Sequence, residues 1–513
     1  MSAGLFRVGM QMRARELQQA VRTAETMRLK LHNWAVGIAA VGMPGERTGL
    51  WGVAVGRIGI VSGPLMPETV GDARSYEGQI ALWRHIGKIL GEAREGARGE
   101  EGRIEVKKPR DAGADAPDGF EWQIVVSSRQ AARLLAESAS RFRYVKDEEA
   151  RNAAEVVWWC LERREFAGSH AAVVLTETFA LHWATGEDGG DPDDLRLWLP
   201  WLQAAVTGND LAALKKRYGA QPPDPITDPK FDAALWKNLE RGEDERSLRV
   251  AYRAAEKGSP QRAELELELR PYRDAHDKAV STALKPVLGA AWKRLVEGWK
   301  LLANDPRPRL AALAQFCAAD EGAWVGQHKR REKGKYMARR DSLRRSVHNW
   351  FEMAAAKECW EGALVWGDRV ARIEAVAAGR SVTGEVVEVG DDGFVLSCAA
   401  GVARVRAGDR MAVDVVPAPV AVDVMDVSGD GERLYVTLEW SEDRLRDELG
   451  DKVELLPALP DFTRRNTGWV GVALSGPHWA IEDKTDAAAY AIGPVSDNGG
   501  DPLAEVEALR RWV

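Results

Sequence analysis

The sequence has few cysteines and lacks the segments that would direct a chain into or across a membrane. Its four cysteines, Cys160, Cys317, Cys359 and Cys398, lie far apart and form no CxxC pair. This spacing excludes a zinc ribbon and a disulfide framework, so we expect structural thiols in a reducing compartment. The first residues contain no apolar signal core, and no run of 18 apolar residues occurs. We therefore expect a cytoplasmic protein that has no membrane partner.

The signatures of common catalytic and cofactor sites are also missing. The chain has no GxxxxGK[ST] loop, no GxGxxG between a strand and a helix, and eight histidines without an HExxH pattern or a Cys/His pair at ligand spacing. Residues 426–437 begin like a calcium loop, but Thr437 occupies the position where a bidentate glutamate is required. We therefore predict no catalytic residues, no metal and no cofactor, and a hairpin at 426–437.

Two Glu-x-Lys tripeptides leave an enzyme open as an alternative. Glu105-Val106-Lys107 and Glu482-Asp483-Lys484 have the residue types of the carboxylate–lysine end of a metal-dependent nuclease site. Such a site needs carboxylates that converge on magnesium beside the scissile phosphate. Tripeptides of this kind also occur by chance in a charged chain, and the first lies in a segment that we expect to be a linker.

The length and the aromatic composition indicate a multidomain protein with many indoles. At roughly 150 residues per domain, 513 residues correspond to about three domains. The 20 tryptophans outnumber the 10 phenylalanines and 8 tyrosines together. We expect most of the indoles in cores and a minority as partner anchors. Heavy use of Ala, Gly, Val and Arg is associated with bacteria of high GC content.

The hydrophobic pattern predicts an α+β multidomain fold that is predominantly helical. The expected units are an N-terminal α+β domain at 1–218 with a mobile insertion at 98–119, a helical domain at 230–378 with a basic helix, a small β-barrel domain at 379–460, and a mixed segment at 461–513 that ends in a helix. Prolines between 222 and 229 suggest the first boundary. The insertion is predicted because 98–119 has few large apolar side chains.

Within the N-terminal domain the pattern predicts mainly helices. Leu17, Val21, Ala24, Leu31 and Ala35 have helical spacing, which predicts one long helix up to the glycines after residue 41. The other expected elements are a hairpin at 50–65, a strand at 121–126 whose following serines cap a helix to 142, and helices at 76–95, 147–165, 195–207 and 211–218.

The hydrophobic period changes from near four to two at about residue 381. Alternating apolar residues occur near 394–398, 411–416 and 433–440, and Gly/Asp turn signals separate them. Five or six short strands in some sixty residues are most economically closed into a small barrel of SH3-like or OB-like type.

The strongest local signal is a basic segment at 326–346, in a chain whose net charge is −7. Its nine basic residues are Lys329, Arg330, Arg331, Lys333, Lys335, Arg339, Arg340, Arg344 and Arg345. Two acidic residues oppose them, so the segment carries +7 and the rest of the chain −14. Downstream, one apolar helical face is formed by Leu343, Val347, Trp350, Phe351 and Ala354, which predicts a helix. Basic side chains at its N-terminal end oppose the helix dipole. Stability alone therefore does not explain the charge.

Three interpretations of the basic segment compete: a contact with nucleic-acid phosphates, a contact with an acidic protein partner, and a solvated helix face. The charge density favours the phosphate contact. The sequence thus predicts a non-catalytic adaptor or scaffold subunit of a larger bacterial multi-protein assembly, in which the basic helix contacts nucleic acid or an acidic protein. The alternative is a nucleic-acid-processing enzyme with a metal-dependent carboxylate site.

Overall fold

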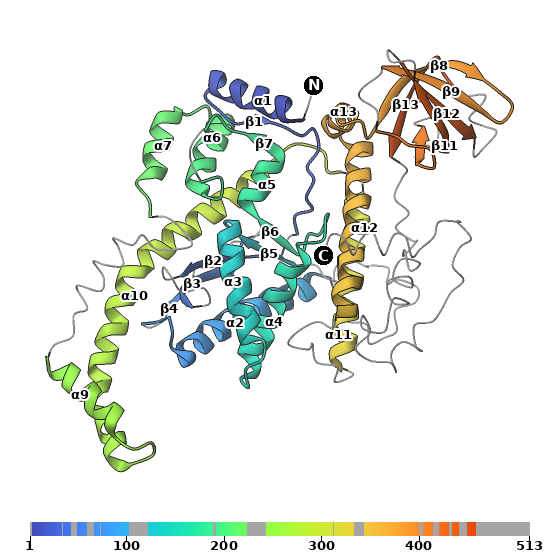
Figure 1. Ribbon diagram of the computed structural model, residues 1–513. Coiled ribbons are helices and arrows are strands. Elements are labelled where there is room, and N and C mark those ends of the chain that lie inside the picture. The colour runs from blue at the N-terminus through green and yellow to red at the C-terminus, as the bar shows by residue number, and fades with distance from the viewer. Residues whose placement is uncertain are drawn as a thin grey trace.

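The computed structural model describes most of the chain. The described residues are 3–32, 34–42, 49–58, 66–71, 73–101, 122–187, 191–222, 243–310, 312–332, 343–399, 404–413, 420–429, 433–440 and 449–457. Helices predominate, a mixed sheet lies in the body, and a separate group of strands follows the last helix (Figure 1). Within the described ranges, no helix is both long enough and apolar enough to cross a bilayer.

The centre of the body is a mixed sheet. Its strands are β2 (Trp34–Gly42), β3 (Leu50–Arg57), β4 (Met66–Thr69), β5 (Trp122–Val126) and β6 (Ala172–Val174). Among the described residues these five strands have the order β4-β3-β2-β5-β6. β2, β5 and β6 run parallel, whereas β3 is antiparallel to its two neighbours. The central strands are nearly continuous apolar runs because both faces of the sheet are covered.

Helices pack on both faces of this sheet. One face contacts α2 (Tyr76–Glu101), α3 (Arg129–Phe142) and α4 (Glu148–Arg163), and the other contacts α10 (Pro260–Ala303). The glycines of β2 allow the close approach. A Cβ at Gly37 would lie 2.7 Å from Leu295 of α10, and a Cβ at Gly42 would lie 2.9 Å from Leu134 of α3. A larger residue at either position would push one helix layer away from the sheet.

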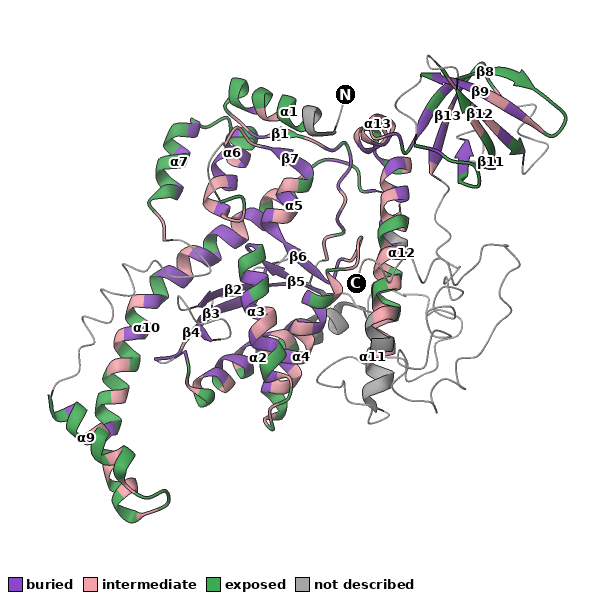
Figure 2. Ribbon diagram, in the orientation of Figure 1, coloured by how far each residue is buried: buried purple, intermediate pink, exposed green. Residues whose placement is uncertain are grey.

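The long helix α10 serves two regions. Its C-terminal half contributes Leu284, Leu288 and Trp299 to the same core as the sheet. The boundary predicted between 218 and 230 therefore does not separate two cores. The N-terminal half pairs with α9 (Glu243–Ala254) in an arm that projects from the body and is largely exposed (Figures 1 and 2). Residues 223–242, which include most of the predicted proline break, lie outside the described residues.

The prediction of one long helix up to the glycines after residue 41 is wrong. α1 (Ala3–Leu17) ends at Gln18, which has a φ of 52°. The chain then extends, and β1 (Val21–Arg22) pairs with β7 (Trp183–Ala184). The Met27 N–H donates to the Pro308 carbonyl at 2.8 Å. Hydrogen bonds to distant segments thus replace the local bonds of a helix.

Several other helices agree with the sequence pattern. Ser128 and Asp147 cap α3 and α4, and α6 (Leu195–Thr207) and α7 (Leu211–Gly219) match the predicted ranges. The short strand β6 and the following α5 (Leu175–His182) were missed. α2 continues to Glu101, so the first residues of the insertion predicted at 98–119 are helical. The remainder, 102–119, lies outside the described residues.

The predicted small β-barrel is confirmed as a closed antiparallel barrel. Its strands are β8 (Val382–Val389), β9 (Gly393–Ala399), β10 (Arg410–Val413), β11 (Val420–Gly429), β12 (Arg433–Trp440) and β13 (Lys452–Pro457). In the described chain these six strands close in the order β10-β11-β12-β9-β8-β13, and each pairs antiparallel with its neighbours. The pairing of β11 with β12 confirms the hairpin expected in place of a calcium loop.

Candidate functional site

The two ends of the basic segment lie in two successive helices. Lys329, Arg330 and Arg331 lie in the last turns of α11 (Leu313–Glu332), and Arg344 and Arg345 lie in the first turn of α12 (Leu343–Gly367). The remaining predicted site residues, Lys333, Lys335, Arg339 and Arg340, lie outside the described residues, as do all nine basic side chains. Glu105, Lys107, Glu482 and Lys484 also lie outside them.

α11 is anchored to the body through the buried Asp320. One carboxylate oxygen accepts from Arg163 Nε at 2.7 Å, and the other accepts from Ser169 Oγ at 2.9 Å and from the His170 N–H at 2.7 Å. Trp324 adds an edge contact with Trp159, with ring centroids 4.7 Å apart. Charge-assisted hydrogen bonds in a dry setting are strong and directional, so they fix the helix that leads into the basic segment.

His170 beside this anchor is a neutral structural group. Burial, assisted by the neighbouring His32 and Lys30, lowers the pKa of His170 to about 3. Its Nδ1 accepts from the Lys30 N–H at 3.4 Å.

Among the described residues, no three His, Cys, Asp or Glu side chains form a group that could hold a metal ion. The cysteine of α11 is not a thiolate at neutral pH, since burial raises the pKa of Cys317 to about 11.

At its other end α12 meets the barrel through a buried corner. Asp368 caps α13 (Arg369–Ala377) and is 1 % exposed. Its carboxylate accepts from the Thr26 N–H at 3.0 Å and from Thr26 Oγ1 at 2.8 Å, and it pairs with Arg28 at 3.3 Å. Burial raises the pKa of Asp368, but the Thr26 N–H and the Arg28 charge outweigh it, so the pKa lies below its ordinary value. The corner thus joins the C-terminal region to the N-terminal segment.

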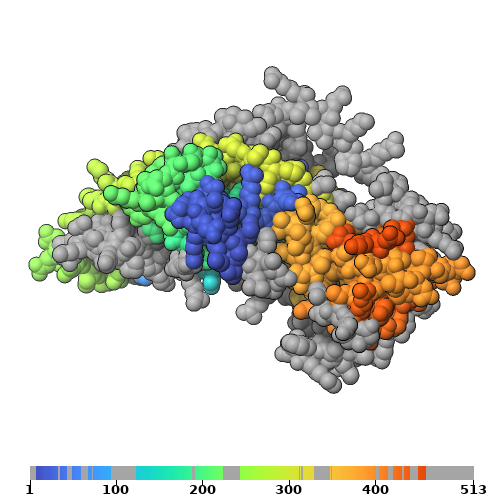
Figure 3. Space-filling view, turned by 90° about the horizontal axis from the view of Figure 1, so that it is seen from above, coloured from blue at the N-terminus to red at the C-terminus, as the bar shows by residue number. Residues whose placement is uncertain are grey.

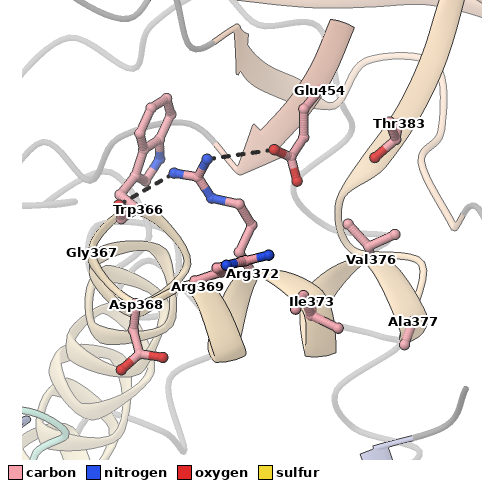
Figure 4. Close-up of a pocket in the computed structure, with 10 residues that line it drawn as sticks. All are labelled: Trp366, Gly367, Asp368, Arg369, Arg372, Ile373, Val376, Ala377, Thr383 and Glu454. Atoms are coloured by element: carbon pink, nitrogen blue, oxygen red, sulfur yellow. Dashed lines mark hydrogen bonds and ion pairs between the residues drawn. The ribbon is translucent and has the colours of Figure 1, made fainter. Parts of the chain in front are cut away.

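A cavity of about 860 Å³ opens between this corner and the barrel (Figure 4). Arg372 of α13 points across it toward Glu454 of β13, with 3.5 Å between the charged atoms. Arg372 also donates to the carbonyls of Val365 and Trp366, and the Trp366 indole donates to the Pro457 carbonyl. These groups hold the barrel beside α12. Figure 3 shows the barrel and the corner as a lobe at the side of the body.

The sequence did not reveal two features of this region. Asp368 follows Gly367, an ordinary helix-end signal, but its partners Thr26 and Arg28 lie 340 residues away and cannot be inferred from spacing. Trp350 was expected on an apolar face of α12, yet it is 53 % exposed. In the sequence, Trp350 differs from the buried indoles because it follows the basic segment by only four residues.

Comparisons with protein-family models, with curated proteins and with solved structures found no match for this chain.

Proposed function

We propose that this protein is a non-catalytic adaptor or scaffold subunit of a cytoplasmic bacterial multi-protein assembly, and that its basic segment at 326–346 contacts nucleic acid. One observation carries the proposal: 21 residues hold a charge of +7, whereas the other residues together hold −14. A polyanion attracted to this chain is therefore directed to one place, because the rest of the surface repels it.

The charge is separated along the molecule. The barrel region, 382–457, has 7 basic and 17 acidic residues and a net charge of −10. It lies at the C-terminal end of α12, while the basic segment lies at the N-terminal end. A helix of 25 residues spans about 37 Å, more than three Debye lengths at physiological salt. At this distance salt screens the negative charge of the barrel, so the barrel weakens the attraction of a polyanion to the basic segment only slightly.

The arrangement of modules supports the scaffold part of the proposal. The body and the barrel have separate cores, and the arm of α9 and α10 projects from another side of the body (Figure 1). Rigid modules that present distinct surfaces are suited to holding several partners. Closure of an antiparallel barrel in fewer than 80 residues also supports an SH3-like or OB-like type for the barrel.

Binding to labelled single-stranded and double-stranded DNA and RNA, measured at about 50 mM and about 200 mM salt, tests the proposal. We expect Glu substitutions of Arg339, Arg340, Arg344 and Arg345 to weaken binding to all sequences alike. The slope of log affinity against log salt should fall by about one unit for each lost phosphate contact.

A matched variant controls for net charge. Glu substitutions of Arg253, Lys257, Arg270 and Lys278 reverse four exposed charges on the projecting arm and should affect binding much less. Absence of binding to every nucleic acid at the lower salt would contradict the phosphate contact. Co-purification followed by mass spectrometry would then identify the acidic protein that binds the segment.

A further inference from the structure

One strand, β13, holds the barrel against α12 and α13. It contacts α12, its Pro457 carbonyl accepts from the Trp366 indole, and its Glu454 pairs with Arg372. In the closed order β10-β11-β12-β9-β8-β13, β12 lies three strands from β13 in either direction. The outer face centred on β12 and β9 is therefore turned away from this attachment (Figure 1).

Two β-bulges lie on this outer face of β8, β9, β12 and β11, which we call the bulged face. The register between β8 and β9 shifts beside Val387, and the register between β11 and β12 shifts beside Met425. A bulge leaves its extra residue unpaired and re-aims the side chain. Val387 is 52 % exposed and Met425 is 55 % exposed. Each bulge thus turns a large apolar side chain toward solvent.

The two bulges belong to the same row of the sheet. Across β8, β9, β12 and β11, the paired residues of this row are Glu388, Val395, Thr437 and Asp426. Val387 directly precedes the first residue of the row, and Met425 directly precedes the last. The row therefore has apolar side chains at both ends and in its middle, and a carboxylate beside each end.

The charge of the bulged face is strongly negative. Strand pairing and exposure place five carboxylates and one guanidinium on it, those of Glu385, Glu388, Asp423, Asp426, Glu439 and Arg433. Glu385 and Asp423 have long, exposed ion pairs with Lys452 and Arg410, at 3.8 Å and 3.9 Å. Within the part of the chain that the structure describes, the other three carboxylates have no ion pair.

Charge complementarity selects the occupant of this face. The carboxylates repel nucleic acid and acidic lipid, and they also repel the same face of a second copy of the chain. A protein segment with apolar side chains between Lys or Arg residues would cover Val387 and Met425 and bring cations to the unpaired carboxylates. An apolar centre within a charged rim is the ordinary composition of a protein interface.

We propose that the bulged face binds a basic amphipathic segment of a partner protein. This goes beyond the proposed function, because such binding needs neither nucleic acid nor the basic segment. The two bulges supply the apolar contacts, and the unpaired carboxylates supply the preference for a basic partner.

Synthetic peptides test the chemistry of the partner against the full chain. The probe is a short helical peptide with leucines on one face and lysines on the other. One control peptide has glutamate in place of lysine, and another has glutamine in place of leucine. Fluorescence anisotropy should show that the leucine–lysine peptide binds at least about 10-fold more tightly than either control, because each control lacks one of the two contacts. No binding of the leucine–lysine peptide, or equal binding of the controls, would overturn the proposal.

Two variants place the binding site on the bulged face. Val387→Ser combined with Met425→Ser should weaken binding about 10-fold, because it removes the apolar contacts. Glu388→Gln, Asp426→Asn and Glu439→Gln together should weaken binding about 5-fold and reduce its dependence on salt. All five side chains are exposed, so the melting temperature should stay unchanged.

Matched variants on the arm control for general stickiness and for net charge. Val250→Ser combined with Leu267→Ser removes two exposed apolar side chains. Glu256→Gln, Glu264→Gln and Glu268→Gln together neutralise three exposed carboxylates. Both arm variants should bind the leucine–lysine peptide like the wild type. Equal effects of the arm and face variants would overturn the bulged face as the binding site.

Sedimentation velocity of the chain alone separates a partner from a second copy. The sedimentation coefficient of the wild type should not change in the variant that carries Val387→Ser and Met425→Ser. An oligomer that dissociates in this variant would overturn the proposal, since a second copy would then cover the face.

Discussion

The barrel and the body of this protein differ in how far apart in the sequence their core residues lie. The barrel core is made by residues between 382 and 455, on strands that mostly follow one another through short connections. The body core joins residues from Ala14 to Trp324. α10 contributes to this core although it follows the last strand of the sheet by more than 80 residues. Patterns within a short window can identify the first kind of core. They identify the second kind only in pieces, because its partners are distant in sequence.

The largest expected effect is the loss of stability when a large side chain is removed from one of the two cores, which should leave the other core unchanged. Trp83 is fully buried in the body, and its indole donates to Ser138 Oγ at 3.3 Å. Trp83→Ala should cost about 3–5 kcal/mol of body stability, and Leu396→Ala in the barrel should cost about 2–5 kcal/mol. Calorimetry should show two unfolding transitions, of which each variant lowers one. If both variants lower both transitions equally, the two cores unfold as a single unit.

A pH titration should distinguish the same two regions. Burial lowers the pKa of His170 to about 3 and that of His182 to about 4, both below the ordinary value of 6.5. The unfolded chain therefore takes up protons first. The stability of the body is fully present above about pH 6.5 and falls below it, by up to about 1.4 kcal/mol per pH unit for each histidine.

The barrel provides the internal control for this titration. Residues 382–457 contain no histidine, so the barrel transition should stay constant between about pH 7 and pH 5, where only histidines titrate. His170→Asn should reduce the pH slope of the body transition. An equal slope in both transitions would contradict the assignment to buried histidines.

A smaller effect is expected at the corner that joins the regions. Asp368→Asn keeps the side-chain shape but leaves Arg28 without its ion-pair partner in a mostly buried position. We expect a loss of about 2 kcal/mol in the coupling between the barrel and the N-terminal segment. Hydrogen exchange of the Thr26 and Arg28 amides should accelerate, while the amides of β9 stay protected. Unchanged exchange at both amides would show that the corner does not couple the regions.

The smallest expected effect concerns an exposed ion pair of the barrel. Lys452 Nζ lies 3.8 Å from Glu385, and the two side chains are 76 % and 58 % exposed. Lys452→Gln should change the barrel stability by less than about 0.5 kcal/mol, because water screens the pair. Denaturant unfolding monitored at the barrel would measure it, and a loss as large as that of Leu396→Ala would contradict the prediction.

The candidate site, like the fold, has features that the sequence identified and features that depend on contacts between distant segments. The basic segment is a matter of composition and was identified from the sequence, although the structure describes none of its basic side chains. Trp350 was placed on the correct helix but on a face expected to be covered, since helical spacing shows which residues share a face and not whether a neighbour packs on it. Asp368 was missed because its partners precede it by some 340 residues.

The sequence by itself determined the period-two strands of the barrel, the capped helices at 129–142 and 148–163, and the concentration of charge at 326–346. Each depends on residues close together in the chain, where side-chain periodicity and capping act directly. Only the tertiary structure decided that residues 20–32 extend instead of continuing a helix, that α10 completes the body core, and that Trp350 stays in solvent. These outcomes depend on hydrogen bonds and packing with distant segments, whose free energy exceeds the local preference of a few tenths of a kcal/mol per residue.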